Sequence, residues 1–270
     1  MKETASDRAD HNLKPSESNA PQDTDQDSID FGYRTVQRSD KAGLVRGVFN
    51  SVAGRYDLMN DLMSGGVHRL WKDALMDWLA PSKGQVLVDI AGGTGDIALR
   101  FLKRGGSHVH VIDINDDMVR AGQKRRDVKA YSSQLDWTVA SAEELPLKTE
   151  TADRVTISFG LRNVTNRDAA LREALRILKP GGRFCCLEFS AVQNKAISML
   201  YDLWSFNALP QLGRMVASDE AAYRYLAESI RTFPAQHDLA RMMSEAGFAQ
   251  VRFRNLSNGI AAIHSGWKLD

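Results

Sequence analysis

The chain has 270 residues, of which 43% are apolar and 26% charged, an ordinary balance for a soluble globular protein. Its net charge of +1 gives no electrostatic reason to expect nucleic acid as a partner. No stretch approaches the roughly 18 apolar residues of a membrane-spanning helix. The length fits one large α/β domain or two small ones.

The first 30 residues differ in composition from the rest of the chain. They carry eight acidic and three basic residues and few apolar ones. Such a segment buries too little apolar surface to fold, so residues 1–30 are predicted to be a disordered acidic tail. It is too acidic for a transit peptide and lacks the apolar centre of a signal peptide. Residues 31–270 are then predicted to form a single domain.

Cysteine usage favours a reducing compartment. Cys185 and Cys186 are adjacent in an apolar stretch, and neighbouring cysteines seldom form a disulfide without strain. Both are predicted to be buried thiols of a cytoplasmic protein. No group of His, Cys, Asp and Glu has the spacing of metal ligands, so no metal is expected.

Helical and strand patterns follow one another along the chain. Residues 41–80 have helical periodicity that is interrupted at Ser64-Gly65-Gly66, which predicts two or three N-terminal helices. From residue 85 onward strands are predicted at 86–91, 109–114, 135–140, 154–159 and 184–189. Helices are predicted between them at 95–104, 116–127 and 166–178, the last stopped by Lys179-Pro180-Gly181-Gly182. This order predicts an α/β fold with a doubly wound, mostly parallel sheet.

The order changes after the fifth strand. Residues 195–232 are predicted to be a helical insert, and a helix at 236–246 follows. Two strands, 249–255 and 259–268, are separated by Ser257-Asn258-Gly259, and Asn-Gly is a strong hairpin signal. A mostly parallel seven-stranded sheet that ends in an antiparallel hairpin resembles the Rossmann-like class I methyltransferase fold.

Residues 85–98 narrow the function more than any other stretch. A strand ends at Asp89, and Gly92, Gly93 and Gly95 lie between it and a helix, where missing Cβ atoms let backbone N–H groups approach a ligand. The loop has two interpretations. Residues 93–98 fit the dinucleotide pattern G-x-G-x-x-A, and Asp113 lies where an acid would hold the ribose of NAD. S-adenosylmethionine presents ribose hydroxyls to an acid at the same strand end.

Two features favour S-adenosylmethionine. Asp89 would lie near the pyrophosphate of NAD, whereas it suits a ligand that carries a cationic ammonium. Ser141 and Ala142 follow the third strand, at the position that borders the adenine in methyltransferases. Ser141 and Glu144 also have the spacing of a helix cap, and both interpretations can hold together. Asp96 is a weaker ligand candidate, because an acid also suits the start of the next helix.

Two segments resemble a known family. The first runs from Phe49 to Ser64, contains Tyr56-Asp57-Leu58-Met59-Asn60 and continues to His68-Arg69-Leu70-Trp71-Lys72. The second contains Phe159-Gly160-Leu161-Arg162-Asn163-Val164. Together they resemble the quinone C-methyltransferase family of ubiquinone and menaquinone biosynthesis, over residues 31–270.

The resemblance implies transfer of a methyl group from S-adenosylmethionine to a ring carbon of a polyprenylated quinol. The implied substrates are the methoxy-benzoquinol precursor of ubiquinone and demethylmenaquinol. It implies cofactor contacts at Thr94, Asp113, Ser141, Ala142 and Ser158, which join the loop residues Asp89, Gly93 and Gly95. Two alternatives stay open, a class I methyltransferase with another lipid or phenolic substrate and a non-catalytic cofactor-binding subunit. A dehydrogenase ranks behind them.

The catalytic prediction centres on Arg162 and Asn163, which follow the fourth strand at the edge where ligands bind. A cation and an amide there would hold the quinol oxygens and stabilise developing negative charge, with Arg162 as the anchor and Asn163 as its partner. Tyr56, Asp57 and His68 are candidate general bases, and His68 has the most suitable ordinary pKa. A water ordered by Arg162 is an equal contender.

The insert at 195–232 mixes large apolar residues with polar ones. It is predicted to form a lid and a prenyl channel and to touch the membrane surface, with simple core packing as the even alternative. The protein would then be peripheral at the inner face of the membrane. A homo-oligomer or a quinone-biosynthesis complex is a further expected assembly.

Overall fold

The computed structural model describes residues 27–52, 61, 64–192, 194 and 220–270, and side chains at 51–52 and 220–223 are left out. The acidic segment before residue 27 lies outside this range. So do Tyr56 and Asp57, as well as residues 195–219 of the predicted insert.

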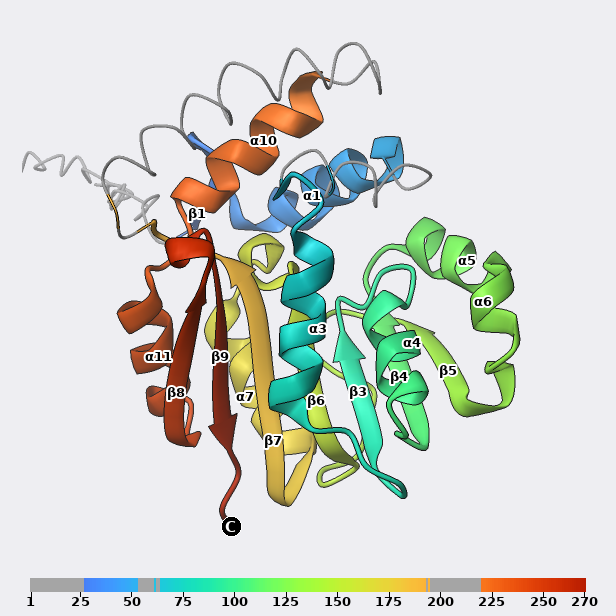
Figure 1. Cartoon of the computed structure of the whole chain (residues 1–270). Coiled ribbons are helices and arrows are strands. Elements are labelled where there is room, and N and C mark those ends of the chain that lie inside the picture. The colour runs from blue at the N-terminus through green and yellow to red at the C-terminus, as the bar shows by residue number, and fades with distance from the viewer. Residues whose placement is uncertain (1–26, 53–60, 62–63, 193, 195–219) are drawn as a thin grey trace, which may run out of the picture.

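A seven-stranded sheet forms the centre of the structure, with its strands in the order β5-β4-β3-β6-β7-β9-β8 (Figure 1). Five strands are mutually parallel: β3 (Val86–Ile90), β4 (His108–Asp113), β5 (Leu135–Val139), β6 (Ala152–Ser158) and β7 (Leu178–Phe189). An antiparallel hairpin of β8 (Ala249–Leu256) and β9 (Ala261–Trp267) completes the sheet beside β7. The predicted doubly wound sheet with a C-terminal hairpin is confirmed. The strand order reverses between β3 and β6, which opens a crevice at the C-terminal ends of these strands.

Helices cover both faces of the sheet, and one apolar cluster lies on each face. α3 (His68–Leu79), α4 (Asp96–Lys103), α5 (Asp116–Lys124) and α6 (Arg126–Lys129) cover one face. α3 buries Trp71, Leu75, Met76 and Leu79, the apolar stripe that its periodicity predicts. α7 (Arg167–Ile177) and α11 (Gln236–Glu245) cover the other face. α1 (Arg38–Val52) and α10 (Glu220–Arg231) lie over the C-terminal ends of the strands (Figure 1).

The predicted boundary of the acidic tail is wrong by three residues. Ser28, Ile29 and Asp30 belong to β1 (Ser28–Phe31), which pairs antiparallel with β2 (Arg34–Gln37). The last residue of β1, Phe31, stacks on Tyr225 of α10 with ring centres 4.2 Å apart. This long-range aromatic contact anchors the short hairpin, although the segment before it is acidic.

Two further boundaries differ from the prediction. The predicted helix at 116–127 is interrupted at Arg125, whose backbone is extended, so α5 ends at Lys124 and α6 begins at Arg126. β7 begins at Leu178 and not at residue 184, because the segment at 179–182 continues in the sheet. There the Gly181 N–H donates to the carbonyl of Lys268 at 2.8 Å. The predicted turn between β8 and β9 is present, with Asn258 and Gly259 both at positive φ.

Candidate cofactor and substrate site

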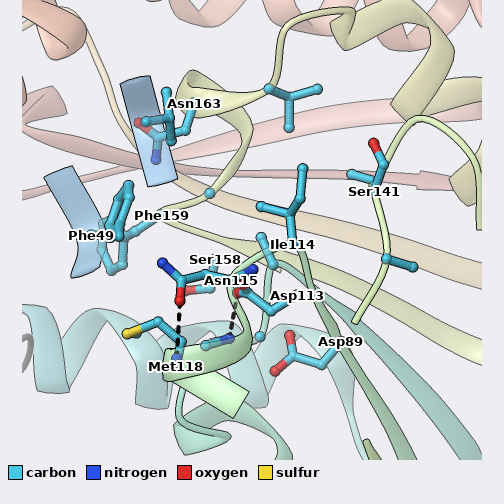
Figure 2. Close-up of a pocket in the computed structure, with 18 of the residues that line it drawn as sticks. Phe49, Asp89, Asp113, Ile114, Asn115, Met118, Ser141, Ser158, Phe159 and Asn163 are labelled. Carbon is cyan, nitrogen blue, oxygen red and sulfur yellow. Dashed lines mark hydrogen bonds between the residues drawn. The ribbon is translucent and has the colours of Figure 1, made fainter. Parts of the chain in front are cut away.

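A pocket lies at the C-terminal ends of β3, β4 and β6, beneath α1 (Figure 2). It holds about 1010 Å³ of empty space, part of it open to solvent. Among the residues that line it are seven of the predicted site residues: Asp89, Gly93, Asp113, Ser141, Ala142, Ser158 and Asn163. The parallel strands therefore bring together side chains that are up to 74 positions apart in the sequence.

Asp89 is completely buried at the floor of the pocket. Its Oδ1 accepts a hydrogen bond from Thr156 Oγ1 at 2.8 Å, while its Oδ2 is buried without a hydrogen-bond partner among the described residues. Burial raises the pKa of Asp89 to about 7. A cationic group at Oδ2 would supply the missing partner and favour the charged carboxylate.

The glycine loop packs closely against this carboxylate. A Cβ at Gly92 would lie 2.7 Å from Val111 Cγ1 and 2.9 Å from Asp89 Oδ2, so no side chain fits there. Gly93 has a φ of +56°, a conformation that favours glycine, and its N–H donates to Asp113 Oδ2 at 2.8 Å. The loop therefore both shapes the pocket and orients Asp113.

Asp113 is held by two backbone donors. Its second oxygen, Oδ1, accepts from the Asn115 N–H at 2.8 Å. Burial raises the pKa of Asp113, although both hydrogen bonds act in the opposite direction. Each oxygen keeps a second lone pair, so the fixed carboxylate can also accept from the hydroxyls of a ribose.

Two serines complete the predicted cofactor wall. Ser158 Oγ, at the end of β6, is buried without a hydrogen-bond partner among the described residues. Ser141 Oγ accepts from the Glu143 N–H at 3.1 Å, and Glu143 Oε1 in turn accepts from the N–H groups of Thr165 and Asn166, each at 3.1 Å. Glu143 therefore links the loop after β5 to the loop after β6.

α1 is fastened over the pocket by an amide pair. Asn115 Nδ2 donates to Asn50 Oδ1 at 2.7 Å, and Asn115 Oδ1 accepts from the Met118 N–H at 3.1 Å and so caps α5. Phe49, next to Asn50 on α1, lines the pocket (Figure 2). Because Asn115 is bound on both sides, the position of α1 depends on the loop that carries Asp113.

Two residues of the predicted cofactor set do not line the pocket. Thr94 turns away from it, and its Oγ1 accepts from Arg125 Nη1 at 3.3 Å. Gly95 begins α4 with a φ of +78°, and a Cβ there would lie 2.7 Å from the ring of Trp137. Packing against that ring explains this glycine.

His68 is buried in a structural position and does not line the pocket. Its Nδ1 lies 3.1 Å from Ser64 Oγ, and its own N–H donates to the same oxygen at 3.1 Å. Burial, aided by the nearby Lys72 ammonium, lowers the pKa of His68 to about 4. An imidazole of such low basicity, away from the wall, is a poor general base. Tyr56 and Asp57 lie outside the described residues.

Arg162 and Asn163 are separated by the structure. The Arg162 side chain is fully buried and does not line the pocket, because its Nη1 pairs with Glu188 Oε1 at 2.7 Å. Asn163 does reach the wall, and its Oδ1 accepts from the hydroxyl of Tyr225 at 3.0 Å. The prediction that Arg162 contacts the substrate directly is therefore wrong. The Asn163 amide faces the pocket, and the Arg162 guanidinium lies behind it.

The sequence did not single out three other residues of the site. Lys72 lines the pocket and pairs with Asp96 at 2.8 Å; although burial acts in the opposite direction, this ammonium lowers the pKa of Asp96 to about 2. Asp96 is thus an ion-pair partner and does not line the pocket. Asn115 precedes Asp116-Asp117 and has the signature of a helix cap, which was a usable signal. Tyr225 lies in the predicted insert, but its contact with Asn163 had no signal in the sequence, because the two residues are 62 positions apart.

Residues 34–268 match the ubiE/COQ5 methyltransferase family. The chain belongs to this family. A Roseobacter denitrificans protein named ubiquinone/menaquinone biosynthesis C-methyltransferase UbiE is 55% identical over 240 residues, which cover 88% of this chain and 96% of that protein. A protein of the same name from Acidiphilium cryptum is 56% identical over 247 residues, which cover 92% and 99%.

Solved structures confirm the fold of this ubiE/COQ5 family member. A SAM-dependent methyltransferase from Thermotoga maritima matches 82% of this chain and 99% of its own, with a TM-score of 0.57 at 21% identity. Family membership confirms the predicted enzyme class and S-adenosylmethionine as the cofactor. Family membership therefore excludes the dinucleotide interpretation of the glycine loop.

Proposed function

We propose that this chain transfers a methyl group from S-adenosylmethionine to a ring carbon of a polyprenylated quinol, in the biosynthesis of ubiquinone, menaquinone or both. The observation that carries the proposal is the pocket floor, where Asp89 Oδ2 and Ser158 Oγ are buried without partners among the described residues. The relatives at 55–56% identity are named for this reaction, which supports the quinol as substrate.

The residues present fit the cofactor. Asp89 Oδ2 suits its ammonium, and Asp113 suits the ribose hydroxyls. The Ser141-Ala142 pair borders the space for the adenine, and Gly92 lets the loop approach the Asp89 carboxylate more closely than a Cβ would allow. When bound, S-adenosylmethionine supplies an electrophilic methyl group on its sulfonium. The chain has to bind this group, place the quinol ring in line with it and exclude water, and such positioning lowers a barrier by up to about 7–11 kcal/mol.

Asn163 is the residue we assign to the quinol. A ring carbon becomes nucleophilic when a neighbouring hydroxyl loses its proton, so negative charge develops on that oxygen. Tyr225 donates to Asn163 Oδ1, which orients the amide and leaves Nδ2 to donate to the quinol oxygen. Burial raises the pKa of Tyr225 to about 12, so its hydroxyl stays protonated and remains a donor.

The test combines a genetic and a biochemical measurement. In a strain lacking this chain, quinone profiling by mass spectrometry should show a quinone that lacks one methyl group, and the wild-type chain should restore the mature form. Purified chain should then transfer labelled methyl to short-prenyl benzoquinol and naphthoquinol acceptors offered separately. The ratio of the two rates assigns the substrate. Normal quinones in the deletion strain, or methylation of neither acceptor, would reject the proposal.

We further propose that the chain meets its quinol at a membrane surface, because a polyprenyl tail is insoluble in water. None of the described helices is both long and apolar enough to cross a bilayer. The predicted contact lies in the insert at 195–232, of which only α10 from Glu220 is described. Liposome flotation of the wild type against Trp204→Glu tests it: equal flotation of both proteins would assign that residue to packing. An oligomer or a larger biosynthetic complex remains a prediction.

A further inference from the structure

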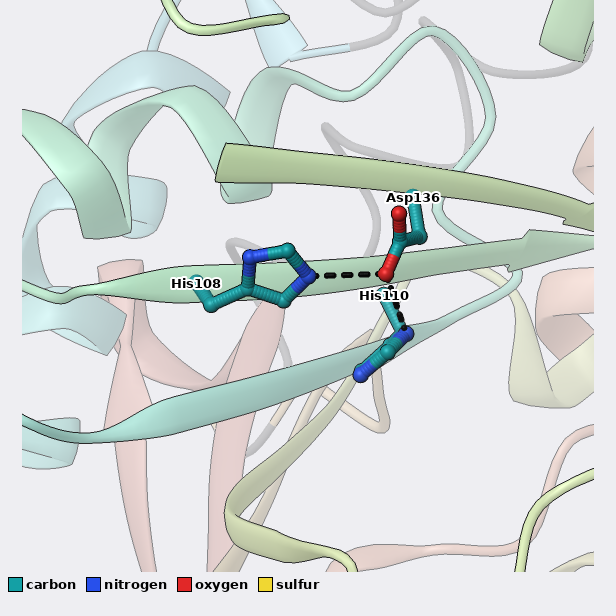
Figure 3. A group of neighbouring side chains, drawn as sticks. All are labelled: His108, His110 and Asp136. Carbon is teal, nitrogen blue, oxygen red and sulfur yellow. Dashed lines mark hydrogen bonds and ion pairs between the residues drawn. The ribbon is translucent and has the colours of Figure 1, made fainter. Parts of the chain in front are cut away.

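His108, His110 and Asp136 converge at an edge of the sheet, away from the cofactor pocket (Figure 3). His108 Nε2 lies 2.8 Å from Asp136 Oδ2, and His110 Nδ1 lies 3.2 Å from the same oxygen. One possible ligand atom from each residue lies within 4.8 Å of the other two. The sequence predicted no metal-ligand cluster, because the third member comes from the neighbouring strand and the register of that pairing is invisible in the sequence.

The backbone places these three side chains on one face. His108 and His110 are two positions apart on β4, so both imidazoles leave the strand on the same side. Asp136 of β5 is the register partner of His110. The intervening Val109 is buried in the apolar cluster of the opposite face. Two paired strands of a continuous sheet therefore hold the three groups together before any ion binds.

We propose that His108, His110 and Asp136 form a binding site for a divalent transition-metal ion of the zinc type. Two imidazoles and one carboxylate are a common protein ligand set for such ions, and water fills the remaining positions. With metal–ligand distances of about 2.0–2.2 Å, the ligand atoms of a tetrahedral site lie about 3.3–3.5 Å apart. The separations of 2.8 and 3.2 Å are near this value, and the remaining pair of ligand atoms lies within 4.8 Å.

The surroundings favour a cation. The Asp136 side chain is 57% exposed, and those of His108 and His110 are 32% and 24% exposed, so an ion can enter from solvent. The Asp136 carboxylate supplies an oxygen ligand between the two imidazole nitrogens.

The site has a structural consequence. β5 is the edge strand, bonded to the rest of the sheet through β4 alone. The C-terminal end of β4 carries Asp113, and the residues after β5 lead to Ser141, so both strands support the pocket. An ion at their other end would clamp the edge strand to its neighbour. We expect the bound ion to stabilise the fold and to take no part in the reaction, because none of the three ligands lines the pocket.

The experiment uses full-length chain without a histidine tag, freed of metal by chelation and titrated with zinc chloride by calorimetry. We expect about one zinc per chain and a rise in Tm when zinc is in excess over Kd. His110→Ala and Asp136→Asn should each weaken binding by about tenfold or more, since even the outer partners of metal ligands are worth about 10–100-fold. The control is His237→Ala, an exposed histidine that contacts Phe253 and is outside the cluster.

The site would be supported if His110→Ala and Asp136→Asn lose both the zinc affinity and the zinc-dependent rise in Tm, while His237→Ala keeps both. Circular dichroism checks the fold of each variant, and Asp136→Asn preserves the shape of an exposed side chain if His110→Ala misfolds. Unchanged zinc affinity in a His108→Ala/His110→Ala double variant would overturn the proposal. Failure of wild-type chain to bind zinc at millimolar concentration would also overturn it and leave only an ion pair.

Discussion

Arg162 and Glu188 form an ion pair at 2.7 Å, and the exposed fractions of their side chains are 0% and 1%. Arg162 also donates to the carbonyl of Phe159 at 2.6 Å, and its guanidinium lies 5.6 Å from the centre of the Phe189 ring. Phe159 has a φ of +56°, a strained value for a bulky residue, and it lines the pocket together with Asn163. The ion pair therefore holds the segment that forms the pocket wall.

Removal of one partner of this pair should destabilise the fold. We expect Arg162→Ala to lose about 3–5 kcal/mol of unfolding free energy, because Glu188 would be left as a buried unpaired charge. Urea denaturation measures it. Arg241→Ala, which breaks an exposed pair with Asp238, is the control and should cost less than about 1 kcal/mol. An Arg162→Ala chain of wild-type stability that lost only turnover would restore Arg162 to direct catalysis.

Asp89→Asn should weaken S-adenosylmethionine binding. The variant keeps an oxygen for Thr156 but presents no negative charge at the buried Oδ2 position. A hydrogen bond to a charged group is worth about 1.5–3 kcal/mol, so we expect Kd to rise about 10- to 100-fold by calorimetry. Asp116→Asn on α5, at a half-buried position where the carboxylate pairs with Arg120, should leave Kd unchanged. Equal affinities of wild type and Asp89→Asn would remove this carboxylate from the cofactor site.

The same carboxylate should make the stability of the cofactor-free protein depend on pH. The pKa of Asp89 is raised from 3.8 to about 7, so between these values the folded chain keeps a proton that the unfolded chain has released. This contribution is complete below about pH 4 and is lost as the pH rises through about 7. Relative to Asp89→Asn, the wild type should lose up to about 4 kcal/mol across that window. Urea titrations of both proteins at several pH values measure the difference, and a constant difference would contradict the raised pKa.

Tyr225→Phe should affect turnover more than cofactor binding. The change deletes the hydrogen bond to Asn163 and leaves the stacking on Phe31 in place. A neutral hydrogen bond contributes about 0.5–1.5 kcal/mol, so kcat should fall about 3- to 10-fold while the Kd of S-adenosylmethionine is kept. Tyr131→Phe, on the segment after α6, serves as the control. Loss of cofactor affinity without loss of kcat would assign Tyr225 to cofactor binding and would contradict its role in orienting Asn163.

Gly92→Ala tests the shape of the loop. The added methyl group would meet Val111 and the Asp89 carboxylate at less than 3.0 Å, so we expect a loss of about 1–3 kcal/mol in stability together with weaker cofactor binding. Gly47→Ala on α1 has no atom within 4 Å of the new Cβ and should be neutral or stabilising. Thermal denaturation and calorimetry on both variants separate the two effects. Wild-type stability and cofactor affinity of Gly92→Ala would mean that the loop can accommodate a Cβ at this position, contrary to these contacts.

The sequence predicted features whose cause is local. Asp89 was found because an apolar strand ends at it, immediately before a glycine loop, and the hairpin at Asn258-Gly259 because both residues accept positive φ. Strand alternation and the family signatures then located the edge of the sheet at which Asp113, Ser141 and Ser158 meet. These signals depend on residues within a few positions of one another.

Features that depend on distant partners escaped the sequence. Arg162 looked like a free cation after a strand, but Glu188, 26 residues later, neutralises it inside the protein. The family resemblance implied a cofactor contact at Thr94, and its hydroxyl bonds Arg125 in the structure. His68 has a suitable pKa in water, and burial in the fold together with the nearby Lys72 ammonium lowers that pKa. Each of these interactions is set by packing, which neither spacing nor composition encodes.

Cys185 and Cys186 are completely buried, and as neighbours on β7 they belong to the apolar clusters of opposite faces of the sheet. Burial raises the pKa of Cys185 to about 12 and that of Cys186 well above its usual value, so the reactive thiolate is scarce in the folded chain. These two are the only cysteines in the sequence. The rate at which the two thiols of the natural protein are alkylated therefore reports how often its central strands open. A single cysteine introduced on the surface would be labelled selectively with a fluorophore.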